Sequence, residues 1–252
     1  MLHTRVIPCL LMRNQGLVKT VKFKDSRYIG DPINAVRIFN EKEVDELMFL
    51  DIGNSGKSVS PDFELLSDIA SEAFMPFAYG GGVTNIDQVK RLYAVGVEKV
   101  VLNTAAAERP HLVSEAARLA GSSGVIVSVD VRRNWRGRHS VHVASGTKDL
   151  KRDPAEYACE MERLGAGEIL LNSIDRDGTK SGYDLELIER VCKAVSIPVV
   201  ASGGAAGLSD LRQAADAGAS GLAAGSMFVY HGKHDAVLIT YPEYDQLERL
   251  FK

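Results

Sequence analysis

The 252-residue chain lacks the features that mark secreted, membrane-spanning and nucleic-acid-binding proteins. It has only three cysteines, Cys9, Cys159 and Cys192, and no Cys-x-x-Cys pair, which predicts reduced thiols and neither disulfides nor a zinc site. No apolar run approaches the roughly 18 residues that a transmembrane helix needs, and the N-terminus has no signal-peptide pattern. The net charge of −3 gives no general basis for binding nucleic acid or an acidic membrane. We therefore expect a cytoplasmic protein that binds neither, and we expect no metal.

Short apolar runs instead alternate with amphipathic segments along the whole chain. The runs are typical of parallel strands that are buried on both faces. They predict strands at residues 5–11, 46–51, 76–79, 99–102, 124–130, 167–172, 197–201 and 221–224. The amphipathic segments predict helices at residues 31–42, 61–73, 86–95, 110–120, 153–164, 184–194, 208–217 and 243–251. The longest irregular segments are expected at 12–30 and 131–152.

This alternation favours an α/β protein with one domain over residues 1–252, folded as a (β/α)8 TIM barrel. A doubly wound open sheet is the alternative. The chain also repeats itself: a shift of 122 residues lays residues 46–51 on 168–173 and residues 96–104 on 218–226. The repeat argues for closure and predicts a barrel built from two similar half-barrels.

Each half ends its strands in small-residue turns that suit phosphate binding. Glycine lets backbone N–H groups approach an anion closely, and a hydroxyl at a helix N-terminus adds a further donor. The candidates are Gly81, Gly82, Asn103 and Thr104 in the first half and Gly203, Gly204, Gly225 and Ser226 in the second. Two such sites across one barrel mouth imply a long substrate phosphorylated at both ends. The alternative is that these residues only make tight turns.

Three other sequence features give weaker evidence about function. Residues 53–58 look like a nucleotide P-loop, but Asp51 stands where that pattern needs glycine, so we interpret them as a polar loop. Segment 132–138 holds four arginines around Trp135, and is either a solvated loop face or a surface for docking or phosphate contact. His139 and His142 have no carboxylate or cysteine beside them to complete a metal site.

Five segments carry a resemblance to the cyclase subunit of imidazole glycerol phosphate synthase. They are residues 7–10 (Ile-Pro-Cys-Leu), 30–32, 45–47, 103–106 and, most specifically, 173–184. The resemblance spans residues 1 to 230. It implies a heterodimer in which a glutaminase subunit sends ammonia through the barrel to a bis-phosphorylated nucleotide, without a cofactor. Two carboxylates at the mouth, at the ends of strands 1 and 5, would act as general acid and base.

The resemblance also implies roles for individual residues. Asp130 matches the strand 5 acid, and Lys19 matches a mobile lysine after strand 1. Asp177, Gly178, Gly204 and Ser226 match phosphate-loop or mouth positions. At the opposite end of the barrel a charged ring would form the ammonia gate, consisting of Arg5, Glu46, Lys99 and Glu168. The alternative for these four residues is a stabilising ion-pair network at that end of the barrel.

The strand 1 acid is missing. Leu11 stands at its position, and the repeat indicates the same gap, because residues 6–11 align with 125–130, here at a shift of 119, and set Leu11 against Asp130. Leucine cannot transfer a proton, and the loss of one acid/base group typically costs about 100- to 10,000-fold in rate. Asp51 and Asp177 are the candidates for a substitute acid.

Three hypotheses follow from this mismatch. The leading one is a divergent paralogue of the acetamidino-sugar branch of surface-polysaccharide (lipopolysaccharide, O-antigen) biosynthesis, which passes ammonia to a sugar amidotransferase; segment 236–242 resembles that branch. The second is a working cyclase of histidine biosynthesis that uses Asp130 with a substitute acid. The third is a non-catalytic ammonia conduit and scaffold.

Overall fold

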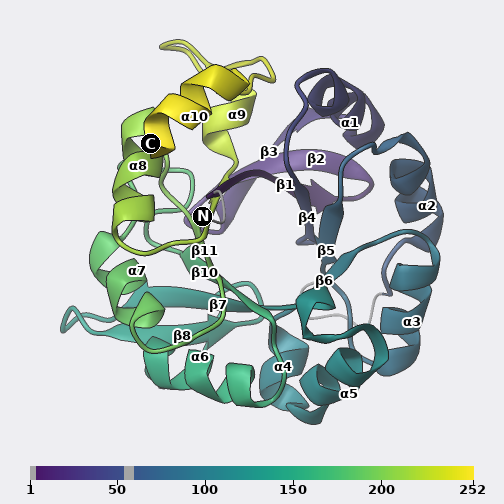
Figure 1. Cartoon of the computed structure of the whole chain (residues 1–252), viewed down its shortest axis with the longest axis vertical. Helices are drawn as coiled ribbons and strands as arrows, with labels where there is room; N and C mark the ends of the chain where they lie inside the picture. The colour runs from purple at the N-terminus through teal and green to yellow at the C-terminus, as the bar shows by residue number, and fades with distance from the viewer. Residues whose placement is uncertain (1–3, 54–59) are drawn as a thin grey trace.

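Eight parallel strands form a closed barrel in the computed structural model, which describes residues 4–53 and 60–252. The order around the barrel is β1, β4, β5, β6, β7, β10, β11 and β12, and β12 pairs with β1 to close it (Figure 1). The strands are β1 (Arg5–Arg13), β4 (Leu47–Asp51), β5 (Phe77–Gly80), β6 (Lys99–Leu102), β7 (Val125–Arg133), β10 (Glu168–Ser173), β11 (Val199–Ser202) and β12 (Gly221–Ala224). The predicted (β/α)8 barrel is confirmed, and the open sheet is excluded.

Helices surround the barrel, and several begin where the sequence carries a capping signal. Asp31 accepts a hydrogen bond from the backbone N–H of Asn34, and Asp153 caps the sixth helix through Ala155 and Glu156. The long helices are α1 (Pro32–Glu41), α2 (Phe63–Glu72), α3 (Ile86–Ala94), α5 (His111–Ala120), α6 (Pro154–Arg163), α7 (Leu185–Cys192), α8 (Leu208–Asp216) and α10 (Tyr244–Phe251). All eight match predicted helices.

Two short helices were not predicted, α4 (Thr104–Glu108) and α9 (Ser226–Val229). Each begins directly at the end of a barrel strand, at Thr104 and at Ser226. A helix of one turn has too few residues to show an amphipathic period, so the sequence pattern could not reveal it. Both place their first backbone N–H groups at the barrel mouth, where those groups lack partners within the helix.

The core has two parts. The smaller one draws apolar side chains from all eight barrel strands, so it must fill the barrel interior; it consists of Ile7, Cys9, Met48, Ala78, Val101, Ile126, Leu170, Val200 and Ala223. The larger one lies between the strands and the helices and includes fully buried Phe39, Phe49 and Tyr79. Inward and outward residues alternate along each strand, as the pleat requires.

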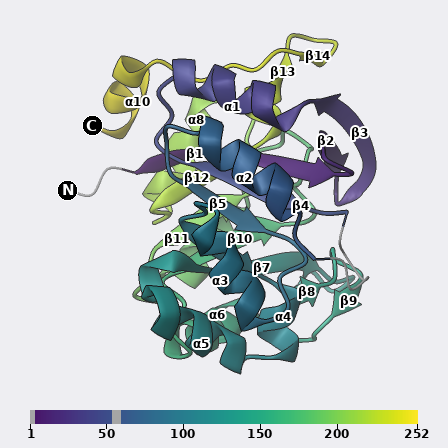
Figure 2. The same ribbon diagram turned by 90° about the vertical axis from the view of Figure 1, so that its right-hand side faces the viewer.

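The two segments expected to be irregular are mostly β-structure. Residues 12–30 form the end of β1, β2 (Gly16–Val21) and β3 (Lys24–Gly30), and 131–152 contain the end of β7, β8 (His139–Val143) and β9 (Lys148–Asp149). The expectation was wrong because antiparallel pairing continues β1 and β7 past the barrel rim. Figure 2 shows these extensions on the side where the barrel strands end.

In the part of the chain that the structure describes, the remaining elements are a 3₁₀ turn at Ser122–Gly124 and a two-stranded ribbon of β13 (Tyr230–His231) and β14 (Ala236–Val237). Within the described residues, no helix is long and apolar enough to cross a membrane. The loop that resembles a P-loop lies largely outside the described residues.

Candidate active site at the barrel mouth

A cavity of about 630 Å³ opens at the carboxyl ends of the barrel strands. This is the end where TIM barrels carry their binding and catalytic residues. All twelve mouth residues predicted from the sequence line it: Lys19, Gly81, Gly82, Asn103, Thr104, Asp130, Asp177, Gly178, Gly203, Gly204, Gly225 and Ser226. The fold therefore brings together residues that are up to 207 positions apart in the chain, since Lys19 and Ser226 share one wall.

Asp130 is the buried carboxyl group of the cavity, with 7% of its surface exposed. Ser128 Oγ donates a hydrogen bond of 2.9 Å to its Oδ1, and Asn103 Nδ2 donates one of 3.2 Å to its Oδ2. Burial raises the pKa of Asp130 to about 7, against hydrogen bonds from Ser128 and Asn172 that lower it. A carboxyl group with this pKa can accept or release a proton near neutral pH.

Two of the residues that hold Asp130 were not predicted from the sequence. Ser128 precedes Asp130 by two positions in β7 and therefore points to the same side of the strand. The two-residue spacing could therefore have revealed Ser128 as a neighbour of Asp130. Asn172 lies beside Asp130 because β10 pairs with β7 in a register that sets these two residues opposite each other. No local pattern in the sequence reveals that pairing.

Lys19 lies folded into the cavity, with 6% of its surface exposed. Its Nζ donates a hydrogen bond of 2.9 Å to the carbonyl oxygen of Cys9, in the middle of β1. Burial lowers the pKa of the Lys19 ammonium group, while the charge of Asp177 raises it. The side chain also packs against Gly225, so closely that an added Cβ at Gly225 would lie 1.8 Å from Nζ.

Asp177 ties the β2–β3 hairpin to the loop after β10. Its Oδ2 accepts hydrogen bonds from Thr20 Oγ1, at 2.8 Å, and from the backbone N–H of Phe23, at 3.1 Å. Burial raises the pKa of Asp177, although both hydrogen bonds lower it. A Cβ at the next residue, Gly178, would lie 2.2 Å from the carbonyl oxygen of Thr20, so only glycine allows the two loops to approach this closely.

The glycine turns after β5 and β11 have backbone conformations that favour glycine. Gly81 has φ +124° and Gly204 has φ +107°. A Cβ at Gly81 would lie 2.3 Å from the carbonyl oxygen of Asp51, and one at Gly204 would lie 2.2 Å from that of Gly182. Both turns therefore depend on glycine and bring the backbone to the edge of the cavity.

Leu11 lines the cavity on the side opposite Asp130, since β1 and β7 face each other across the closed barrel. It lies in register with Leu50 on β4, so two leucines stand side by side in this wall. Neither candidate substitute acid has an uncommitted carboxylate. Asp51 Oδ1 accepts a hydrogen bond of 2.8 Å from the backbone N–H of Gly53, and Asp177 is held as described above.

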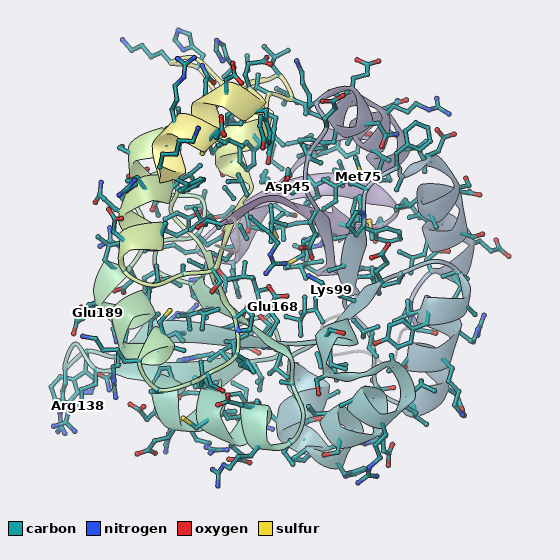
Figure 3. All side chains as sticks on the ribbon, viewed as in Figure 1. Asp45, Met75, Lys99, Arg138, Glu168 and Glu189 are labelled. Carbon is teal, nitrogen blue, oxygen red and sulfur yellow. The ribbon has the colours of Figure 1, made fainter. Side chains whose placement is uncertain are left out.

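The four residues of the predicted gate meet at the other end of the barrel, where the strands begin. Arg5 donates hydrogen bonds of 2.5 Å to both Glu46 and Glu168, and Lys99 Nζ lies 2.8 Å from Glu46 and 3.2 Å from Glu168. The two glutamate side chains are only 4% and 6% exposed. Figure 3 looks into this end, with Lys99 and Glu168 near the centre. The ring links β1, β6 and β10 with the start of β4.

Among the described residues, no group of three or more histidine, cysteine, aspartate or glutamate side chains could hold a metal ion. Arg132 to Arg138 and Trp135 belong to the β7–β8 hairpin, outside the cavity lining. His139 Nε2 lies 3.1 Å from Asp184 Oδ2 and His142 Nδ1 lies 3.1 Å from the Ser140 carbonyl, so both histidines have protein partners.

Comparison with known proteins agrees with this arrangement. The model of the histidine biosynthesis protein family matches residues 5–235. A Pseudomonas aeruginosa protein, provisionally named imidazole glycerol phosphate synthase subunit hisF2, is 50% identical over 98% of this chain and 99% of its own. A similar Leptospira borgpetersenii protein, provisionally named subunit HisF, is 46% identical over 100% of both chains. The imidazole glycerol phosphate synthase subunit HisF of Gluconacetobacter diazotrophicus is 43% identical over 90% of this chain and 88% of its own. The chain therefore belongs to the histidine biosynthesis protein family, as a barrel of the HisF cyclase-subunit type.

Proposed function

We propose that this chain receives ammonia from a glutaminase subunit, as one half of a cytoplasmic heterodimer, and serves acetamidino-sugar biosynthesis for a surface polysaccharide. The observation that carries the proposal is Leu11. It stands opposite Asp130 in a cavity whose other predicted residues are all present. A barrel that keeps its entrance and its phosphate turns but has one acid in place of two is suited to a changed final step.

The mouth suits a phosphorylated small molecule. In this proposal Gly81, Gly82, Asn103 and Thr104 bind one phosphate through backbone N–H groups at the start of α4. Gly203, Gly204, Gly225 and Ser226 bind a second at the start of α9. Lys19 and the Asp177–Gly178 loop complete the cavity between the sites, and Asp130 transfers protons.

The ring of Arg5, Glu46, Lys99 and Glu168 acts as the ammonia gate in this proposal. It stands at the strand starts, and directly above it the barrel interior is lined by apolar side chains. An apolar passage favours neutral ammonia over ammonium, because burying an unpaired charge is costly. The names of the relatives as synthase subunits support a glutaminase partner, which this proposal assigns to the same end of the barrel.

The direct test is a cyclase assay with ammonia and the bis-phosphorylated ribulosyl aminoimidazole carboxamide nucleotide. We expect turnover at least about 100-fold below that of a two-carboxylate HisF subunit assayed in parallel, since one acid/base group is absent. Glutamine-dependent transfer of ammonia to the sugar amidotransferase should proceed in the same preparation when the glutaminase is present. Turnover comparable to the HisF control, or rescue of a histidine auxotroph, would contradict the proposal.

An active cyclase is the second candidate, and one observation favours it. Asp130 has a pKa near 7 and is held by three donors, so it could serve as acid and base in turn. The two candidates predict opposite results in the cyclase assay. The variant Asp130→Asn distinguishes a non-catalytic conduit from both of these candidates. It should leave the transfer of ammonia unchanged only if the barrel carries out no chemistry.

A further inference from the structure

The β7–β8 hairpin projects from the barrel as a separate feature of the surface. β7 carries Asp130 at the cavity and then continues to Arg133, residues 134–138 turn the chain, and β8 returns antiparallel. In Figure 1 the hairpin reaches beyond the ring of helices, and Figure 3 labels Arg138 at its end. Because the barrel strands run toward the mouth, this tip lies on the mouth side and away from the charged ring at the strand starts.

Hydrogen bonds within the tip and at its base hold it in one conformation. Asn134 Oδ1 accepts from the backbone N–H groups of Arg136 and Arg138, at 2.9 and 3.0 Å. At the base, Arg133 donates to Asp184 at 3.2 Å and to Glu186 at 2.8 Å.

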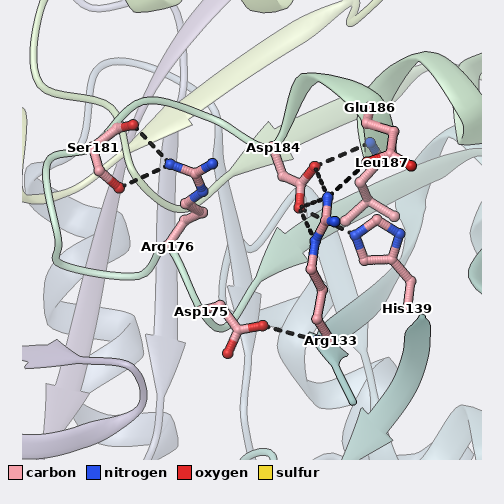
Figure 4. A network of polar contacts seen from close by, with 8 residues as sticks. All are labelled: Arg133, His139, Asp175, Arg176, Ser181, Asp184, Glu186 and Leu187. Carbon is pink, nitrogen blue, oxygen red and sulfur yellow. Dashed lines mark hydrogen bonds and ion pairs between the residues drawn. The ribbon is translucent and has the colours of Figure 1, made fainter. Parts of the chain in front are cut away.

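His139 joins the same carboxylate, with Nε2 3.1 Å from Asp184 Oδ2 (Figure 4). Burial alone would raise the pKa of Asp184, but His139 and Arg133 hold it well below its usual range, so Asp184 stays ionised as the anchor. A preorganised hairpin of this kind binds a partner with little cost in ordering.

The exposed side chains of the tip are suited to a protein partner with carboxylates. Trp135 is the only tryptophan of the chain and is 86% exposed, and the Arg136 guanidinium lies 4.4 Å from its ring centroid. Among the described residues, no carboxylate pairs with Arg136 or Arg138. Tryptophan and arginine are the side chains most enriched at binding hot spots, and unpaired cations gain most from an acidic partner.

We propose that the hairpin tip, residues 134–138, is the docking point for the enzyme that consumes the ammonia, through an acidic patch on that enzyme. This rests on the proposed function, in which ammonia leaves the barrel at the mouth and is used by a second protein. That enzyme must cover the mouth to receive ammonia before it escapes, and the tip provides a binding contact at the rim. The glutaminase binds the opposite end, so the two partners do not compete.

The test uses the complete chain–glutaminase complex and the purified amidotransferase of the acetamidino-sugar pathway from the same organism. Variants Trp135→Ala and Arg136→Glu/Arg138→Glu should each weaken amidotransferase binding at least about tenfold in calorimetry, the second more steeply at low salt. Glutamine-dependent amidation should fall in parallel, while amidation driven by added ammonium chloride should not change. The control is Lys90→Glu on α3, a charge reversal on the far side of the barrel in Figure 1, which should bind like wild type.

The outcomes separate the two proposals. If the wild-type complex passes no ammonia to the amidotransferase, the proposed function fails and the docking site fails with it. If transfer proceeds and the tip variants bind and transfer like wild type, the docking proposal alone is wrong. It is also wrong if Lys90→Glu weakens binding equally, or if the tip variants lose binding only to a DNA duplex or to phosphatidylglycerol vesicles.

Discussion

Lys19 and Gly225 are in contact at the barrel mouth, one from β2 and the other from the turn that precedes α9. The ammonium group of Lys19 occupies the space that any side chain at Gly225 would need, and a Cβ there would also lie 2.9 Å from the carbonyl oxygen of Cys9. The position of Lys19 therefore depends on glycine at residue 225, which leaves space for the cation within the second phosphate site.

We expect Gly225→Ala to expel Lys19 from this position and to weaken binding of a phosphorylated ligand. The effect should be about tenfold or more, because a charge-assisted hydrogen bond to the phosphate contributes on the order of 1.5 to 3 kcal/mol. Calorimetry with the bis-phosphorylated nucleotide measures it. Gly207→Ala is the matched control, since nothing lies within 4 Å of its added Cβ. Equal affinity of both variants would show that Lys19 does not contribute.

The raised pKa of Asp130 predicts a pH-dependent stability with a definite sign. Its pKa is about 7 in the folded chain and 3.8 as a model value, so the folded state binds its proton more tightly. Its contribution to stability is therefore complete below pH 3.8 and is lost as pH rises through 7.

Asp130→Asn removes this dependence. Its free energy of unfolding, relative to wild type, should rise by on the order of 1 to 3 kcal/mol between pH 5 and pH 8. Urea denaturation at both pH values measures the difference. Asp68→Asn, on the surface of α2, should show no such change. A difference between Asp130→Asn and wild type that does not vary with pH would mean that Asp130 is ionised throughout.

The barrel could be predicted from the sequence, whereas its extensions could not. Parallel strands buried on both faces leave short apolar runs, and the helices between them leave an amphipathic period. The turn at Lys22-Phe23 has positive φ without the glycine or Asn-Gly pair that usually marks such a turn, and the β8–β9 turn, which does contain Gly146, leads into a strand of only two residues, Lys148–Asp149. The β2–β3 and β8–β9 hairpins therefore resembled loops.

The residues of the candidate site likewise include some that could be predicted from the sequence and some that could not. Asp130 and Gly204 could be predicted from their positions at strand ends, whereas Lys19 was predicted only through the family resemblance. Asn172 could not, because its contact with Asp130 arises only when β10 pairs with β7. The missing acid at Leu11 was visible in the sequence, but its neighbour Leu50, which makes that wall of the cavity apolar, becomes evident only from the β1–β4 register.

Restoring the absent acid tests whether Leu11 alone limits the chemistry. We expect Leu11→Asp to raise cyclase turnover by about 100-fold or more, because it places a second acid/base group across the mouth from Asp130. The control is Leu11→Asn, which has the same shape and cannot exchange a proton in this range. Steady-state assays with ammonia and the nucleotide measure both. If the two variants have equal turnover, the lost acid is not the reason for low activity.

The charged ring allows stability and gating to be separated. Among the described residues, Lys99→Met leaves Glu46 and Glu168 with Arg5 as their only cationic partner, and these carboxylates are almost fully buried. The free energy of unfolding should therefore fall by about 1 to 3 kcal/mol, since Lys99 itself is partly exposed. Lys193→Met is the control: its pair with Glu189 is exposed on both sides, so its loss should leave the free energy of unfolding nearly unchanged.

The double variant Lys99→Met/Glu46→Gln leaves a balanced Arg5–Glu168 pair and should recover most of the lost stability. Urea denaturation tests this recovery, and a coupled assay compares glutamine-dependent with ammonia-dependent transfer. If the ring is a gate, glutamine-dependent transfer should remain altered in the double variant even though its stability has recovered. Ammonia-dependent transfer should be unchanged in the same variant. If transfer recovers together with stability, the ring is a structural ion-pair network and ammonia enters the barrel without its control.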